Sequence, residues 1–123
     1  MIKRVFIGIK NKTYTLKIRV DETKKIISYG SQILETFDRY EITLIALYEC
    51  VKKADYGDTI FFYANNDLMN FQWEVEWKKE KHLSSKTKLI ELWDAIILET
   101  SIKNIDLTVK GENSVLSAYG RLL

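Results

Sequence analysis

The fold is decided by residues 13–20, Thr-Tyr-Thr-Leu-Lys-Ile-Arg-Val, in which polar and apolar side chains alternate without a break. A period of two predicts a half-buried strand, with the apolar face turned toward a core. Segments 2–9 before it and 23–29 after it are also strand-like. The connections at 11–12 and 21–22 are short enough for hairpins, so the chain is predicted to open as a three-stranded antiparallel meander.

From Asp38 onward the apolar period becomes that of a helix. Apolar residues recur at helical spacing from Glu41 to Val51, and Asp38 stands where a helix cap is expected. Residues 58–64, Asp-Thr-Ile-Phe-Phe-Tyr-Ala, then predict a central strand covered on both faces. Helices over 67–79 and 86–100, a strand over 105–110 and a short helix from residue 113 complete the predicted order β-β-β-α-β-α-α-β-α.

Length and composition bound the architecture. The chain has 123 residues, of which 46% are hydrophobic, and it has no proline, repeat or low-complexity linker. These features predict a single domain over 1–123 with one core. Its start lacks the features of a secretory signal, and no apolar run is long enough to cross a bilayer. We therefore expect a cytosolic protein without a membrane partner.

The net charge of +2 is small, but it is unevenly distributed. Segment 78–88 has five lysines and one acid, a net charge of +4, whereas the rest of the chain carries −2. The single cysteine, Cys50, cannot form an internal disulfide and falls in the helical pattern, which predicts a buried, inert thiol. His82 is predicted to be a surface histidine, and no Cys/His cluster has zinc-ligand spacing.

The order of elements resembles that of the bacterial-type ribonuclease H fold, and several strings fit it. Residues 40–44, Tyr-Glu-Ile-Thr-Leu, resemble the start of the family's first helix, where a glutamate ligates metal. Trp73, the string Trp77-Lys78-Lys79 and the pair Leu92-Trp93 resemble its tryptophan-bearing helix and basic protrusion. Residues 109–113 resemble the end of its last strand. The resemblance implies an α/β fold whose mixed five-stranded sheet joins the meander to two parallel strands, flanked by helices.

The resemblance also implies hydrolysis of the RNA strand of an RNA–DNA hybrid with two magnesium ions. Four carboxylates hold these ions, because neighbouring divalent cations repel strongly unless anionic oxygens surround them. The matching positions here are Gly8, Glu41, Asn65 and Ser117, of which Glu41 alone is an acid. Lys10-Asn11-Lys12 replaces the family's glycine-rich turn and adds positive charge. We therefore expect a pseudoenzyme with a degenerate carboxylate set, without a metal cofactor.

Three functions stay open. The first is binding to an RNA–DNA hybrid or duplex backbone through the protrusion, with contacts from Trp77, Lys78, Lys79, Lys81, Lys86 and Lys88. Against it, such lysines are often only a solvated surface, and Trp73, Trp77 and Trp93 are more often core residues.

The second function is a protein-interaction scaffold or tether that uses strand 23–29, Tyr29, the adjoining loop 30–34 and the exposed side of the meander. Lys24 and Lys25 in that strand also read as ordinary protection against strand pairing. The third is a divergent nuclease that uses Mg²⁺ or Mn²⁺, in which Asp38 or Asp67 joins Glu41. A helix cap and a first-turn acid are the alternative roles of these two aspartates.

Overall fold

A computed structural model describes residues 1–63 and 87–110 of the chain. The predicted helix over 67–79 and the helix from residue 113 lie outside these residues. Within them the elements are β1 (Ile2–Lys10), β2 (Thr13–Val20), β3 (Lys25–Gly30), α1 (Arg39–Lys53), β4 (Thr59–Tyr63), α3 (Thr87–Ile102) and β5 (Asp106–Lys110).

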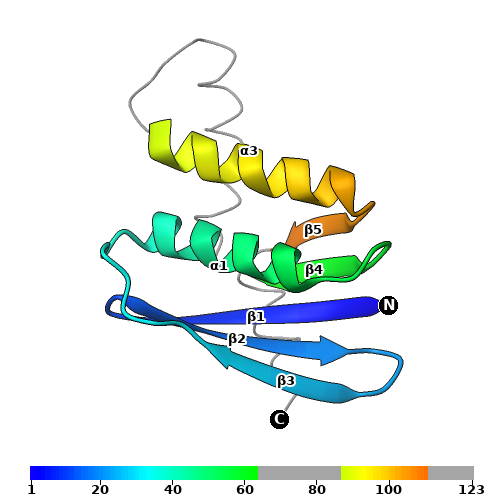
Figure 1. The fold of residues 1–123 in the computed structure, drawn as a ribbon. Coiled ribbons are helices and arrows are strands. Elements are labelled where there is room, and N and C mark those ends of the chain that lie inside the picture. Colours follow the sequence, from blue (N-terminus) through cyan, green and yellow to red (C-terminus); the bar gives the residue numbers. More distant parts are fainter. Residues whose placement is uncertain (64–86, 111–123) are drawn as a thin grey trace.

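The five strands form one mixed sheet in the order β3-β2-β1-β4-β5 (Figure 1). β1 pairs antiparallel with β2, and β2 with β3, which confirms the predicted meander. β4 pairs parallel with β1, and β5 parallel with β4, because α1 and α3 return the chain to the same end of the sheet. This is a ribonuclease H-like α/β arrangement, as the order of elements predicted.

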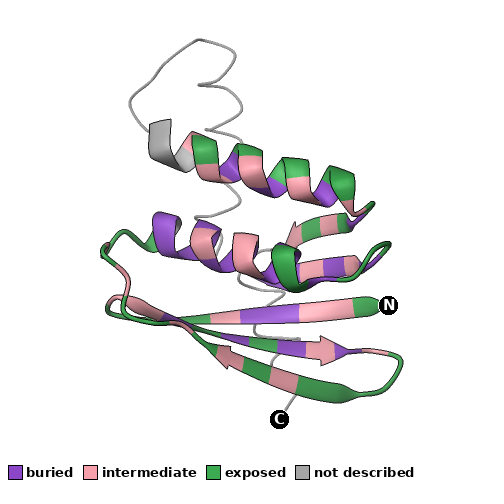
Figure 2. Ribbon diagram, viewed as in Figure 1, coloured by how far each residue is buried: buried purple, intermediate pink, exposed green. Residues whose placement is uncertain are grey.

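Both described helices lie on one side of the sheet, with α1 above β1 and β2 and α3 beside α1 (Figure 1). Buried residues, purple on the ribbon in Figure 2, occur in the sheet and in both helices, and they form one hydrophobic core. Burying each such aliphatic or aromatic side chain contributes about 1.5–3 kcal/mol. Trp93 is 5% exposed and belongs to this core, as predicted for it. The principal fully buried side chains are Val5, Leu16, Ile42, Leu44, Leu47, Val51, Ile60, Phe62 and Ile96.

The opposite face of the sheet is held by a cluster on β1 and β4. The rings of Phe6 and Tyr63 stack with their centroids 4.8 Å apart. A guanidinium N–H of Arg4 donates to the Tyr63 hydroxyl at 2.8 Å, and its Nε lies 3.2 Å from Asp21. Burial lowers the pKa of Arg4, but Tyr63 and Asp21 outweigh burial and leave the pKa above its ordinary value. These contacts fix the pairing of β1 with β4.

Local geometry places the ends of β3 and α1. Lys24 has a φ of 57° and donates its N–H to the Val20 carbonyl, so the third strand begins at Lys25 and not at the predicted residue 23. Asp38 occupies the N-cap position of α1, where its carbonyl accepts the Ile42 N–H at 2.9 Å.

Among the described residues, no helix is long and apolar enough to cross a membrane.

Candidate functional site

The first-strand position of the expected metal site is open and neutral. Gly8 lies in β1 opposite Thr15, on the sheet face that points away from α1. It is exposed, and a Cβ built at this glycine would have no atom of residues 1–63 and 87–110 within 4 Å. The backbone therefore has room for a side chain, yet the sequence supplies no carboxylate here.

Glu41 is the single acid in the family set, and it lies in the first turn of α1. Its side chain is buried, with 9% exposure. An acid in a first turn is also favoured by the helix dipole, whether or not a metal is present. Asn65 and Ser117, the other two matching positions, and Asp67 lie outside the described residues. Across residues 1–63 and 87–110, no three His, Cys, Asp or Glu side chains gather in a way that could hold a metal ion.

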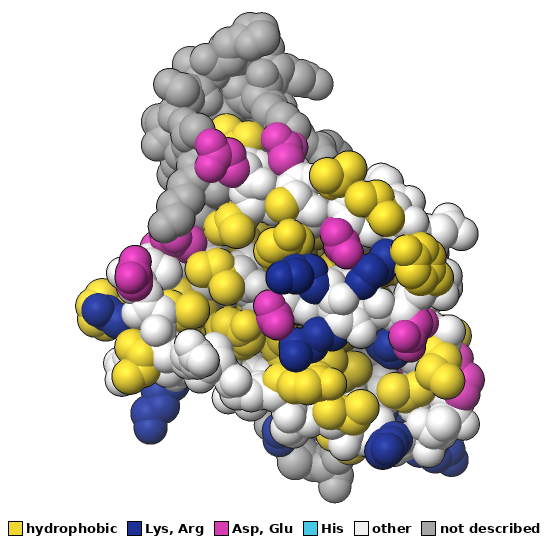
Figure 3. Space-filling view, in the orientation of Figure 1, with side chains coloured by type: hydrophobic (Ala, Val, Ile, Leu, Met, Phe, Trp, Pro, Cys, Tyr) yellow, Lys and Arg dark blue, Asp and Glu magenta, His cyan; other side chains and the backbone are white. Residues whose placement is uncertain are grey.

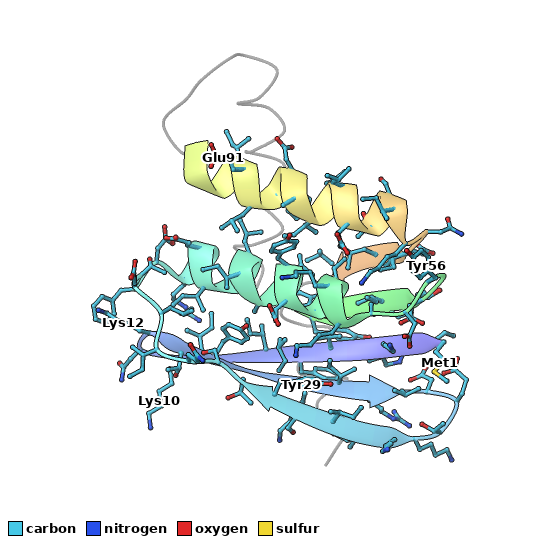
Figure 4. All side chains as sticks on the ribbon, in the orientation of Figure 1. Met1, Lys10, Lys12, Tyr29, Tyr56 and Glu91 are labelled. Carbon is cyan, nitrogen blue, oxygen red and sulfur yellow. The ribbon has the colours of Figure 1, made fainter. Side chains whose placement is uncertain are left out.

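The β1–β2 hairpin brings positive charge to this end of the sheet. Asn11 takes a φ of 53°, which a two-residue turn requires, and the Thr13 hydroxyl donates to the Lys10 carbonyl at 2.8 Å. Lys10 is exposed and shares a sheet face with Gly8, two residues along β1. Lys12 Nζ lies 4.5 Å from the centre of the Phe37 ring. Figure 4 shows Lys10 and Lys12 together at this end, opposite Met1 and Tyr56.

The described residues do not fit a two-magnesium site. Two such ions need several anionic oxygens, whereas Gly8 supplies none and Lys10 places a cation on the same face. One buried carboxylate at Glu41 leaves most of the charge of two ions uncompensated.

Most of the predicted nucleic-acid contacts lie outside the described residues: Trp77, Lys78, Lys79, Lys81 and Lys86. Lys88 lies in the first turn of α3. The outer faces of α1 and α3 are not basic surfaces. Figure 3 shows acidic, basic and apolar side chains intermixed on this face, without a continuous basic area.

A second candidate site lies beside β3, where the interaction surface was predicted. A hollow of about 360 Å³ opens between the end of the β2–β3 pair and α1. The sequence indicated Tyr29 and loop 30–34 for this surface, but it did not indicate the wall that α1 supplies. That wall consists of Ile45, Glu49 and Lys53, which follow one another at i, i+4 and i+8 on one face of the helix. This spacing is a signal in the sequence that could have indicated the wall. The lining residues are Tyr14, Leu16, Tyr29, Gly30, Ser31, Gln32, Leu34, Ile45, Glu49 and Lys53.

Hydrogen bonds fix the shape of this hollow. Ser31 donates its N–H to the Tyr14 carbonyl at 2.9 Å, and its hydroxyl oxygen accepts the Tyr14 N–H at 2.8 Å. Leu34 donates its N–H to the Lys12 carbonyl at 2.8 Å. Burial, with the nearby Glu49 carboxylate, raises the pKa of Tyr14. The phenol therefore stays neutral at physiological pH, and the hollow combines an apolar floor with a polar rim.

A charged cluster at the opposite end of the sheet has a structural role. Asp58, 1% exposed, accepts the Asp55 N–H at 2.9 Å and lies 2.6 Å from Lys3 Nζ. Burial alone would raise the pKa of Asp58, but the Lys3 ammonium and the Asp55 amide lower it below its ordinary value. Lys103 Nζ donates to two carbonyls of α1, those of Val51 and Lys52, and to the carbonyl of Ala54 directly after the helix. These contacts join β1, β4 and the helix ends.

Cys50 is buried in α1, as predicted. Burial raises the pKa of its thiol to about 12. The thiolate is the nucleophile in cysteine chemistry, so this side chain is inert at neutral pH.

Comparisons with known proteins assign no family to the chain. No family model matches the chain, and no curated protein is similar to it in sequence. Among solved structures, the chain is similar to the solution structure of the PFV RNase H domain, with 13% sequence identity and a TM-score of 0.49. The match covers 90% of this chain and 77% of that chain. The ribonuclease H-like class rests on the strand order and directions of the sheet itself.

Proposed function

We propose that this chain is a ribonuclease H-like domain without metal-dependent nuclease activity, which binds the phosphate backbone of an RNA–DNA hybrid or duplex. One observation carries the proposal: glycine replaces the first-strand carboxylate at residue 8, with Lys10 beside it on the same sheet face. A metal-holding position has become a neutral position next to a cation.

The physical argument concerns the sign of the charge at this end of the sheet. A two-metal nuclease brings substrate phosphate to the protein through bound cations. Exposed lysines attract the same phosphates directly, without sequence preference and with strong salt dependence. Lys10 and Lys12 supply such charge at the hairpin, and segment 78–88 adds a net +4 in the sequence.

Binding to a fluorescent RNA–DNA hybrid, followed by anisotropy, tests the proposal. The affinity should fall by orders of magnitude between about 50 and 200 mM salt if several phosphates are contacted. The variants Lys10→Glu/Lys12→Glu and Lys78→Glu/Lys79→Glu/Lys81→Glu should each weaken binding. Lys25→Glu, a charge reversal at the other end of the sheet, is the matched control. Affinity that ignores both salt and the two sets of substitutions would overturn the proposal.

The same hybrid tests for nuclease activity. We expect no cleavage with Mg²⁺ or Mn²⁺, because Glu41 alone cannot compensate the charge of two ions. Cleavage that needs the metal and disappears in Glu41→Gln would establish the third candidate, a divergent nuclease. Cleavage that survives this substitution would indicate contamination.

A protein-interaction scaffold is the second candidate function, and the hollow beside β3 favours it. The hollow joins the predicted surface at Tyr29 and loop 30–34 to a wall from α1. Binding at this place would not require the charge at the hairpin end.

A further inference from the structure

The outer edge of β3 presents unused backbone groups. In the antiparallel pairing of β2 with β3, residues alternate between those bonded to the partner strand and those pointing away. The Ser31 N–H donates to the Tyr14 carbonyl, so the backbone N–H and C=O groups of the odd-numbered residues of β3 point toward β2. The N–H and C=O groups of Ile26, Ser28 and Gly30 therefore point outward. No described segment pairs with this edge, since β3 is the terminal strand.

β3 is also poorly covered. None of its residues is buried, and Figure 2 shows it without purple segments. Ile26 is 48% exposed, and beyond the strand Ile33 is 80% exposed. An edge with exposed apolar side chains, whose amides pair with no segment that the structure describes, is a template for another strand.

The hollow continues this edge on the helix side of the sheet. Tyr29 and Ser31 line it, and successive side chains of a strand point to opposite faces. A strand added beside β3 would thus direct every second side chain toward the hollow. A volume of about 360 Å³ is at the lower end of ligand pockets and suits one large apolar side chain from such a strand.

Charge at the other end of β3 indicates what the added strand carries. Lys24 and Lys25 are exposed, and neither forms an ion pair with any residue that the structure describes. At the hollow, Lys53 Nζ lies 4.6 Å from the centre of the Tyr29 ring and 3.7 Å from Glu49. β3 itself contains no acid, and Glu22 of the preceding turn accepts the Ile2 N–H at 2.8 Å, so the charge of the two lysines complements an acidic segment.

We propose that the outer edge of β3, with the adjoining hollow, binds an extended acidic segment of a partner protein as a sixth strand of the sheet. One large apolar side chain of that segment fills the hollow, and its acidic residues lie near Lys24 and Lys25. The backbone bonds supply affinity, and the hollow and lysines supply selectivity. This inference does not depend on nucleic-acid binding, because it concerns a different edge and different residues.

A second copy of this chain complements the edge less well. If two β3 strands paired antiparallel about Ser28, Lys25 would face Ser31 of the other copy and Lys24 would face Gln32. Neither residue is acidic, so the lysines would stay uncompensated. Lysines on an exposed edge also generally oppose pairing between identical strands.

The test uses a phage-displayed library of random dodecapeptides selected against the full chain. We expect the selected peptides to alternate apolar with polar residues, to be acidic and to contain a large apolar residue. Hydrogen exchange should show that a bound peptide slows exchange of the Ser28 and Gly30 amides, which point away from β2.

Two substitutions of Ser28 test whether the outward backbone groups of β3 are needed for peptide binding. Ser28→Pro removes an outward N–H and no bond to β2, so it blocks strand addition while leaving the sheet paired. It should weaken the selected peptides by about tenfold or more. Ser28→Ala keeps the N–H and is the matched control, with affinity close to that of the native chain. Circular dichroism verifies that both variants fold, and Lys24→Glu/Lys25→Glu provides an independent loss of affinity for the acidic peptides.

Each outcome decides the proposal. Acidic peptides that protect the edge amides and lose affinity in Ser28→Pro and Lys24→Glu/Lys25→Glu support it. Selection of no peptide, or of peptides that bind Ser28→Pro as well as the native chain, overturns it. Concentration-dependent dimers with the edge amides protected in the absence of peptide would also overturn it, because a second copy would then occupy β3.

Discussion

Asp58 holds the end of the sheet opposite the hairpin, and Asp58→Asn tests how much this contact contributes. The substitution keeps the shape of the side chain but removes the charge that faces Lys3 Nζ at 2.6 Å. Removing one partner of a buried pair costs about 3–5 kcal/mol. Lys3 Nζ also lies 3.4 Å from Asp55, whose side chain is 79% exposed, and this second acid recovers part of the loss. We therefore expect unfolding to become easier by roughly 2–3 kcal/mol.

Urea unfolding at neutral pH, followed by circular dichroism, measures this difference. Asp106→Asn is the control, because it removes an exposed carboxylate at the start of neighbouring β5. The control should change stability by no more than about 0.5 kcal/mol. If Asp58→Asn were as stable as the control, Asp58 would not organise this end of the sheet, and the electrostatic account would be refuted.

The pH dependence gives a second reading of the same contact. The pKa of Asp58 lies below its ordinary value of 3.8 in the folded chain, so the unfolded chain binds the proton more readily. The stabilisation by the charged carboxylate is therefore fully present above about pH 4, and it is lost as pH falls through the folded pKa. The gap in stability between the native chain and Asp58→Asn should narrow in strong acid. A gap that widened there would contradict the assigned direction.

Three further predictions follow from single contacts. Lys103→Met removes an ammonium that donates hydrogen bonds to the carbonyls of Val51, Lys52 and Ala54 at the end of α1. The free energy of unfolding in urea should fall by about 1–3 kcal/mol, whereas Lys52→Met should change it little. Cys50 should resist a thiol reagent in the folded chain at neutral pH and react once urea unfolds it; rapid reaction of the folded chain would disprove its burial. Asn11→Gly should preserve the thermal midpoint, whereas Asn11→Val should lower it, because Asn11 has a φ of 53°.

The sequence predicted the strands and helices that carry strong periodicity. The alternation over 13–20 predicted β2, and the apolar run over 58–64 predicted β4, because burial on one or both faces leaves its mark on every residue. The start of β3 was two residues off, since it depends on the conformation of Lys24 and not on hydrophobicity. Trp93 was predicted correctly as a core residue, because tryptophan side chains are more often packed in a core than exposed.

The sites were only partly readable from the sequence. Glu41 could be placed in the first turn of its helix, and Gly8 in the first strand, by order along the chain. The face that Gly8 shares with Lys10 follows from strand alternation, but its exposure and free space required the packed sheet. The predicted contacts at Trp77, Lys78, Lys79, Lys81 and Lys86 remain predictions of the sequence.

The sequence by itself determined the types and the order of the elements that the structure describes, because these depend on local pattern and residue identity. The tertiary structure alone decided which distant residues meet. It joined Glu49 and Lys53 of α1 to Tyr29 of β3, and Lys3 of β1 to Asp58, across long separations in the chain. Such contacts arise from the pairing of strands and the packing of helices, which burial of the whole core selects and no local period records.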